Sequence, residues 1–300
     1  MGYTDAVQAL LGELAAQSLR PSTINRYQDA LAAFQEHLKL HGVAELRGVR
    51  REHVEAFQQK LLAKNYAPRT VRAWVYPVRR LFHRLCERGE LFVSPAANVP
   101  QVPERNKKPR RLVTATELAR LFAAPDLKTR LGIRERAMLE TLYGTAMRLR
   151  ELVRLDVADI DMGTGLAHIR EGKGRKARVV PLGHESARWL ATYMATSRTY
   201  WVRRRPKEPR LWVNNRGNEI SVDSVHAMLT KLSRRARVTP SVYPHAFRYA
   251  AATHMMQRGA DLLTIKELLG HKRIQTTQIY TLVASADVQR THARTHPLGS

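Results

Sequence analysis

The residues of this chain that could carry chemistry are cations, imidazoles and one tyrosine, spread over its second half. They are Arg148, Lys173, His245, Arg248, His271 and Tyr280. Arginine forks match phosphate oxygens, and fixed cations stabilise the extra negative charge of a phosphodiester transition state. A lysine can protonate a leaving oxygen, and a tyrosine hydroxyl can attack phosphorus to form a covalent link. The set therefore predicts phosphoryl transfer with Tyr280 as the nucleophile.

Other chemistries find less support in the sequence. It contains no carboxylate pair in a pattern that suits a glycosidase or a two-metal nuclease, and no GxSxG nucleophile motif. His245, His254 and His271 match no zinc-binding spacing. The single cysteine, Cys86, excludes a cysteine-rich zinc site and an internal disulfide. We therefore expect neither a metal nor another cofactor.

The charge balance points to a polyanionic partner. The chain has 51 Lys and Arg against 26 Asp and Glu, which gives a formal net charge of +25. Such an excess favours nucleic acid, because each neutralised phosphate releases counterions. An anionic membrane surface is the alternative, but an apolar run of about 18 residues and a signal peptide are both lacking. We expect a cytoplasmic protein associated with the nucleoid.

The first 93 residues predict a helical domain. Apolar residues recur at helical spacing over 5–19, from Pro21 to a cap at Gly42, over 50–63, and from Pro68 to a stop at Gly89. The last of these helices carries Arg69, Arg72, Arg79 and Arg80. A solvated helix face explains any one of them, but their clustering predicts contacts with a DNA backbone.

A basic, proline-rich stretch separates the two halves. Residues 94–111 carry four prolines and no periodicity, which predicts an extended linker. Its Lys107 and Lys108 are candidate DNA contacts. We therefore divide the chain into a helical domain over 1–93, this linker, and a catalytic domain with a tail over 112–300.

Two upstream elements must position Arg148 and Lys173. Arg148 and Glu151 are three residues apart in a largely apolar helix, so Glu151 is expected to orient the arginine; an exposed ion pair of little energetic value is the alternative. Residues 165–170 and 178–182 predict a β-hairpin whose turn displays Lys173. Arg175 and Lys176 in that turn are further candidate DNA contacts. A short strand is also predicted over 211–213.

The remaining candidates lie on three consecutive helices. Pro244 begins a helix whose electropositive N-terminus carries His245 and Arg248 on one face. Asp261 begins the next helix, and Gly270 ends it immediately before His271. Thr276 or Thr277 begins a last helix that carries Tyr280.

Four segments resemble, in order, the signature blocks of the tyrosine recombinases, the phage-integrase and Xer-type family. They are LYGTAMRLREL, EGKGRKARVVPLG, PHAFRYAAATHMM and LLGHKRIQTTQIYT. The first half also resembles the family's core-binding domain. The resemblance implies a mainly α fold with a small β-sheet (α+β), in which a SAM-like helical DNA-binding domain precedes the catalytic domain.

The resemblance also implies a role for each candidate. Tyr280 would attack the scissile phosphate, leaving a 3′-phosphotyrosyl link and a free 5′-hydroxyl. Arg148 and Arg248 would clamp the phosphate, and His271 would bind a non-bridging oxygen. His245 would handle the nucleophile's proton or bind the phosphate, and Lys173 would protonate the leaving oxygen. Neither ATP nor a metal is needed, because the covalent link conserves the bond energy.

The implied partners are double-stranded DNA with inverted-repeat sites and further recombinase subunits, in a tetramer of identical chains or with a paralogous recombinase. Two other functions stay open: strand nicking and relaxation like that of a type IB topoisomerase, and DNA binding without cleavage on the same fold. The family pattern is not matched at Ala146, where glycine is common, at Tyr249, where histidine is common, or at Lys272, where serine is common.

Overall fold

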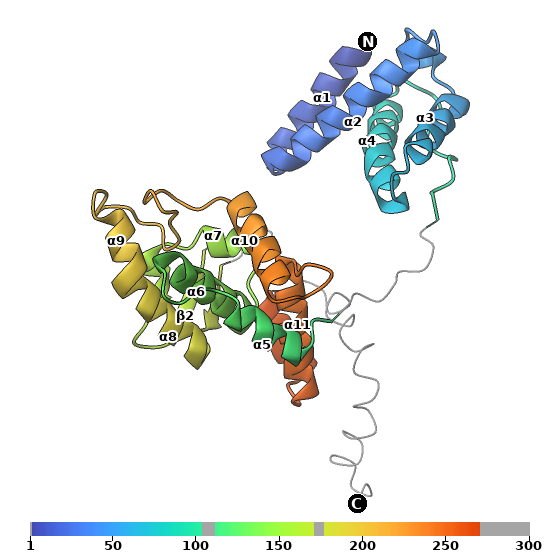
Figure 1. Cartoon of the computed structure of the whole chain (residues 1–300). Helices are drawn as coiled ribbons and strands as arrows, with labels where there is room; N and C mark the ends of the chain where they lie inside the picture. The colour runs from blue at the N-terminus through green and yellow to red at the C-terminus, as the bar shows by residue number, and fades with distance from the viewer. Residues whose placement is uncertain (1, 104–111, 171–176, 271–300) are drawn as a thin grey trace, which may run out of the picture. The chain divides into compact units, whose positions relative to one another are not determined.

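The computed structural model describes residues 2–103, 112–170 and 177–270. The chain divides into two compact units, Met1–Pro109 and Arg110–Ser300, which are described separately (Figure 1). The fold is mainly helical with a small antiparallel sheet, as predicted. No helix in the described ranges is long and apolar enough to cross a membrane.

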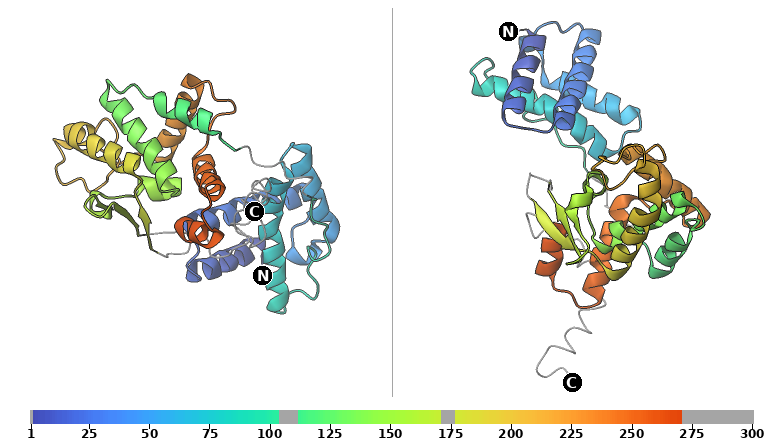
Figure 2. Two further views of the ribbon diagram at one scale, coloured as in Figure 1. Left: turned by 90° about the horizontal axis from the view of Figure 1, so that it is seen from below. Right: turned by 90° about the vertical axis from the view of Figure 1, so that its left-hand side faces the viewer.

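The N-terminal unit is a bundle of four helices. They are α1 (Tyr3–Ala16), α2 (Pro21–Leu40), α3 (Arg51–Ala63) and α4 (Pro68–Glu87), with a short 3-10 helix, η1 (Leu46–Gly48), before α3. Helix α2 packs against the other three, and Figure 2 shows α1 and α2 side by side. The core centres on Phe34, whose ring meets those of Phe57 and Phe82 edge-on at 5.2 and 6.2 Å. The four predicted helices are confirmed.

The predicted linker is wrong over its first part. Ala96, Val99 and Val102 are buried in the core of the N-terminal unit. Side chains of two helices also hold this segment: Gln58 donates to the carbonyl of Pro100 at 3.2 Å, and Arg79 donates to the carbonyl of Val99. Sequence periodicity misses such packing, because isolated apolar residues between prolines can be buried without forming a helix or strand.

The C-terminal unit is built around one central helix, α6 (Arg130–Gly144). Helix α6 contacts α5 (Ala115–Ala123), α7 (Leu149–Val153), α8 (His184–Thr192), η3 (Tyr193–Arg198) and α11 (Pro244–Gln257). The remaining helices are η2 (Val157–Asp159), α9 (Thr199–Val202), α10 (Val222–Arg235) and α12 (Leu262–Leu269). Figure 1 shows α8 and α9 on one side of α6 and α10 and α11 on the other.

Short polar side chains begin several of these helices. Thr114 accepts a hydrogen bond from the backbone N–H of Glu117 at 3.2 Å, which caps α5. Asp261 accepts from the backbone N–H groups of Leu263 and Thr264 at 2.8 and 2.9 Å, which caps α12. Such caps satisfy N–H groups that have no partner within the helix.

A three-stranded antiparallel sheet lies beside these helices, in the order β1 (Ile160–Asp161), β2 (Leu166–Ile169), β3 (Arg178–Pro181). Strands β2 and β3 pair from Leu166 opposite Pro181 to Ile169 opposite Arg178, and this is the predicted hairpin. The two-residue strand β1 was not predicted, because it is too short to show alternation.

The predicted strand over 211–213 is wrong. Only isolated bridges occur at this stretch and next to it: Val213 pairs with Glu219, and the preceding Arg210 pairs with Asp156. The Tyr193 hydroxyl donates to the carbonyl of Leu211 and accepts from the N–H of Val213, both at 3.1 Å. A side chain therefore satisfies backbone groups that a neighbouring strand would otherwise pair.

The buried His37 predicts a pH dependence of stability. Its Nδ1 is buried without a hydrogen-bond partner, its Nε2 lies 3.2 Å from the carbonyl of His53, and its ring lies 4.2 Å from that of His41. Burial and the neighbouring His41 lower the pKa of His37 below the ordinary value of 6.5. The unfolded chain therefore binds a proton first, and the free energy of unfolding falls as pH drops below about 6.5.

We expect His37→Gln to weaken this acid sensitivity in urea unfolding of the full chain at pH 7.5 and 5.5. His83→Gln, which changes an exposed histidine of the same unit, should keep the wild-type dependence. Equal pH dependence of His37→Gln and the wild type would contradict the assignment.

Candidate active site

Arg148 sits at the N-terminus of the short helix α7, held twice by Glu151. The backbone N–H of Arg148 donates to Glu151 Oε2 at 2.8 Å, and its Nη1 donates to Oε1 at 2.7 Å. Glu151 closes a capping box that fixes where α7 begins. The side chain of Arg148 is 21% exposed and that of Glu151 only 4%. This geometry matches the oriented, part-buried arginine that the three-residue spacing predicts. It does not match the alternative, an exposed ion pair.

A second arginine shares the same carboxylate. Arg178, the first residue of β3, donates through Nη1 to Glu151 Oε1 at 3.0 Å and through Nη2 to Oε2 at 2.7 Å. Burial alone would raise the pKa of Glu151, but hydrogen bonds from Arg178 and Arg148 outweigh it and lower the pKa to about 2. Glu151 is therefore ionised at neutral pH and lies between two guanidinium groups.

Arg248 lies on α11 and is only 4% exposed. Its Nη1 donates to the carbonyl of Ala146 at 2.7 Å, and its Nη2 donates to the carbonyl of Leu269, at the end of α12. Ala146 lies two residues before Arg148, so this contact ties the two candidate arginines to one short stretch of backbone.

His245 is exposed one helical turn before Arg248, in the first turn of α11. Pro244 occupies the first helical position, where its missing N–H removes no hydrogen bond. The structure therefore places His245 and Arg248 on one face of the helix, as their spacing predicts.

The backbone before Arg148 is constrained. Ala146 has a φ of 49°, in the left-handed region, and is fully buried. A non-glycine residue there costs ~1–2 kcal/mol. The chain must turn here to direct the Ala146 carbonyl at Arg248. This turn gives a physical reason why glycine is common at this position in the family that the sequence resembles.

Two arginine side chains hold the last turn of α12. Besides Arg248, Arg178 contacts this turn, donating through Nε to the carbonyl of Leu268 at 3.3 Å. The last carbonyls of a helix lack partners within it and carry partial negative charge, so cations are stabilising there. Gly270, with a φ of 60°, ends the helix in the left-handed conformation that the sequence predicts.

Several predicted residues lie outside the described ranges. They are Lys107, Lys108, Lys173, Arg175, Lys176, His271 and Tyr280. The described part therefore brings together Arg148, Glu151 and Arg248, with His245 one turn away.

The four candidate DNA contacts on α4 differ in their surroundings. Arg69, Arg72 and Arg80 flank Tyr76, a tyrosine that is 55% exposed. Arg79 differs, because it donates to the carbonyl of Val99 and so holds the chain that follows α4. An intramolecular contact of this kind cannot be foreseen from a cluster of charges.

Arg178 was missed by the sequence analysis. The signal becomes visible once the strand register is known: Arg178 and the fully buried Val180 share one face of β3, while Val179 between them is 50% exposed. An arginine on the inner face beside a valine on the outer face inverts the usual alternation and indicates a partner for the arginine.

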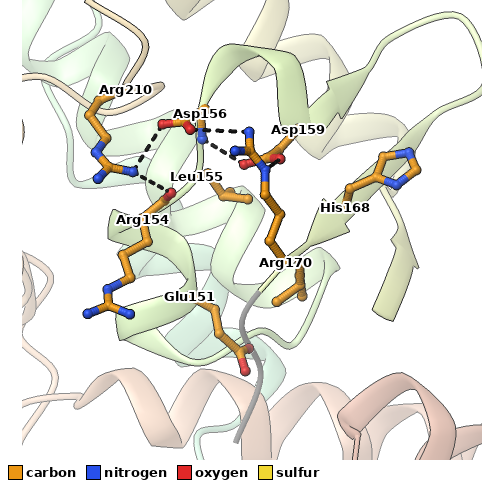
Figure 3. A pocket seen from close by; sticks show the side chains of 9 residues that line it. Glu151, Arg154, Leu155, Asp156, Asp159, His168, Arg170 and Arg210 are labelled. Atoms are coloured by element: carbon orange, nitrogen blue, oxygen red, sulfur yellow. Dashed lines mark hydrogen bonds and ion pairs between the residues drawn. The ribbon is translucent and has the colours of Figure 1, made fainter. Parts of the chain in front are cut away.

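A hollow beside Glu151 is lined by ion pairs. Arg170 and Arg210 lie 3.1 and 3.0 Å from the carboxylate of Asp156. Figure 3 shows this network at one end of the hollow and Glu151 at the other, with its carboxylate pointing away from the network. Among residues 2–103, 112–170 and 177–270, no three His, Cys, Asp or Glu side chains form a group that could hold a metal.

The lowered pKa of Glu151 predicts a stability effect. A carboxylate whose pKa falls from 4.5 to about 2 on folding contributes about 3 kcal/mol at neutral pH. This contribution is present above pH 4.5 and is lost as pH falls towards 2. We expect Glu151→Gln to lower the free energy of unfolding by about this amount at pH 7 and by less at pH 3. Urea unfolding measures both values.

Glu185→Gln is the matched control, because Glu185 makes an exposed pair with Arg188. It should leave the free energy of unfolding nearly unchanged at both pH values, because exposed ion pairs contribute little. A Glu151→Gln effect that is the same at pH 7 and pH 3 would show that the ionised carboxylate is not its source.

The chain matches known proteins over both of its units. Residues 111–286 match the model of the phage integrase family, and residues 7–90 match that of the phage integrase N-terminal SAM-like domain. The chain is 32% identical to tyrosine recombinase XerC of Oceanobacillus iheyensis over 92% of its length and 90% of the relative's. It is 28% identical to tyrosine recombinase XerD of Staphylococcus epidermidis over 94% of each chain.

Solved structures share the fold. A crystal structure of XerH site-specific recombinase bound to a palindromic difH substrate aligns with a TM-score of 0.73 and 20% identity, covering 90% of this chain and 79% of the other. A lambda integrase dimer bound to a COC′ core site aligns with a TM-score of 0.71 and 15% identity, covering 93% and 77%. The two family models together span both units, and the matched range 111–286 includes the sequence positions of Arg148, Arg248 and Tyr280. The chain belongs to the phage integrase family.

Proposed function

We propose that this protein is a site-specific DNA recombinase that cleaves and rejoins strands through a 3′-phosphotyrosyl intermediate. The observation that carries the proposal is that Arg248 donates to the carbonyl of Ala146, two residues before Arg148, while Glu151 fixes Arg148. The relatives named tyrosine recombinases, which match over most of their length, support it.

In the proposed reaction the Tyr280 oxygen attacks the scissile phosphorus as the bond to the 5′-oxygen breaks. The tyrosine proton passes to a base, for which His245 is the candidate, and Lys173 protonates the leaving oxygen. Arg148, Arg248 and His271 stabilise the charge on the non-bridging oxygens. A 5′-hydroxyl from another strand then attacks the phosphotyrosine, which restores the phosphodiester and frees Tyr280. No nucleotide is hydrolysed, because one ester replaces another.

The proposed partner is double-stranded DNA with inverted-repeat sites, bound by a tetramer of this chain or of this chain and a paralogous recombinase. A lambda integrase tetramer bound to a Holliday junction shares the fold, with a TM-score of 0.72. The net charge of +25 fits such a substrate. We place this activity in the cytoplasm, at the nucleoid. On α4, Arg69, Arg72 and Arg80 are the proposed backbone contacts, with Lys107, Lys108, Arg175 and Lys176 as further ones.

The central test uses a suicide DNA substrate that carries the cognate site, with a nick that lets the cleaved end diffuse away. We expect the wild type to form a covalent protein–DNA adduct that denaturing gels resolve, and Tyr280→Phe to form none while binding the same DNA. Absence of an adduct from the wild type would favour the non-cleaving alternative. Relaxation of a supercoiled plasmid with one site, without recombination between two sites, would favour topoisomerase activity.

Arg148→Lys should separate catalysis from binding. A lysine keeps the charge but loses the planar fork, so transition-state stabilisation suffers more than ground-state attraction. We expect the cleavage rate at saturating DNA to fall by ~10²-fold or more and the Kd to change by less than ~3-fold. Comparable losses in rate and affinity would contradict the clamp role.

A further inference from the structure

Arg178 occupies the junction of three elements of the C-terminal unit. It begins β3, its guanidinium forks onto Glu151 in α7, and its Nε donates to the Leu268 carbonyl in the last turn of α12. Only 12% of its side chain is exposed. The guanidinium of Arg178 is largely buried and donates hydrogen bonds to three acceptor atoms, so its position is fixed.

The end of α12 is shaped around this side chain. A Cβ added to Gly270 would lie 3.1 Å from Arg178 Cδ and 3.3 Å from Nε, so a larger residue would press on the guanidinium. The left-handed φ of Gly270 independently disfavours other residues. Close packing at both the carboxylate and the helix end thus holds Arg178.

Charge balance gives Arg178 a role beyond packing. Glu151 carries one negative charge between two guanidinium groups, so the net charge of the three side chains is +1. Without Arg178, the full charge of Glu151 would fall on Arg148 and would neutralise the cation that must face a phosphate. With Arg178 present, Glu151 can orient Arg148 while the group of three side chains keeps a net positive charge.

We propose that Arg178 is a positioning residue for the proposed cleavage reaction: it holds Glu151, and through it Arg148, against the last turn of α12. The proposal rests on the proposed function, because it assigns Arg148 to the phosphate. Lysine cannot replace arginine here, since a single ammonium group lacks the fork that spans both carboxylate oxygens and the separate Nε that meets Leu268.

The first experiment measures cleavage of the suicide substrate at saturating DNA, together with Kd, for the full-length wild type, Arg178→Lys and Arg188→Lys. We expect Arg178→Lys to cleave ~10–100-fold more slowly with a Kd within ~3-fold of the wild type. Arg188, which pairs with Glu185 at the surface, is the matched control, and its variant should cleave at the wild-type rate. Wild-type cleavage by Arg178→Lys would overturn the proposal.

The second experiment asks whether Arg178 acts through Arg148. If it does, adding Arg178→Lys to Arg148→Lys should slow cleavage by less than ~3-fold further, because the aligned group has already been lost. A general weakening of the fold would instead multiply the two effects. Multiplied effects would overturn the proposal.

A chemically altered substrate separates Arg178 from the leaving group. A 5′-bridging phosphorothiolate leaves as a thiolate and needs no proton from Lys173. We expect it to leave the defect of Arg178→Lys in place. Restoration of the wild-type rate would show that Arg178 acts on leaving-group protonation, which would overturn the route through Arg148.

A final measurement needs no activity. The shifts in urea midpoint caused by Arg178→Lys and Glu151→Gln should be non-additive, because both break the same pair. Additive shifts would overturn the coupling of Arg178 to Glu151. If the wild type forms no adduct while this coupling holds, the proposed function fails but the structural link stands. If the wild type forms an adduct and Arg178→Lys matches its rate, only the inference about Arg178 fails.

Discussion

The candidate site of the C-terminal unit depends on one buried carboxylate, that of Glu151. An ionised carboxylate that is almost fully shielded from water is tolerable only when cations and N–H groups surround it. Arg148 and Arg178 supply these donors from two separate elements, α7 and β3. The cost of leaving any of the three charges unpaired keeps these elements together, so the same contacts that satisfy the buried carboxylate fix Arg148, the proposed phosphate ligand.

A second set of hydrogen bonds links the arginines to the last turn of α12. Arg248 and Arg178 donate to the carbonyls of Leu269 and Leu268, so α12 ends against side chains from α11 and β3. Residues far apart in the sequence thereby converge on the turn that precedes His271. The geometry is fixed mainly by arginine bonds to backbone and carboxylate oxygens, which are directional, while apolar packing supplies the stable frame.

Much of this fold and site could be predicted from the sequence. The parts that could not be predicted have one cause in common. Helix periodicity and caps located α11 and α12, and the three-residue spacing paired Arg148 with Glu151, because these signals are local. The role of Arg178 and the burial of Val99 depend on which faces meet in three dimensions. The 211–213 stretch has the composition of a strand, yet the Tyr193 hydroxyl takes the place of a neighbouring strand.

The left-handed Ala146 also limits which residues the motif before Arg148 can accommodate. The position is fully buried and has a positive φ, so a β-branched or long side chain would meet both a backbone penalty and a lack of space. Glycine and alanine are the residues that fit. Searches for related proteins that require glycine here would miss chains such as this one, because a backbone angle and full burial define the position.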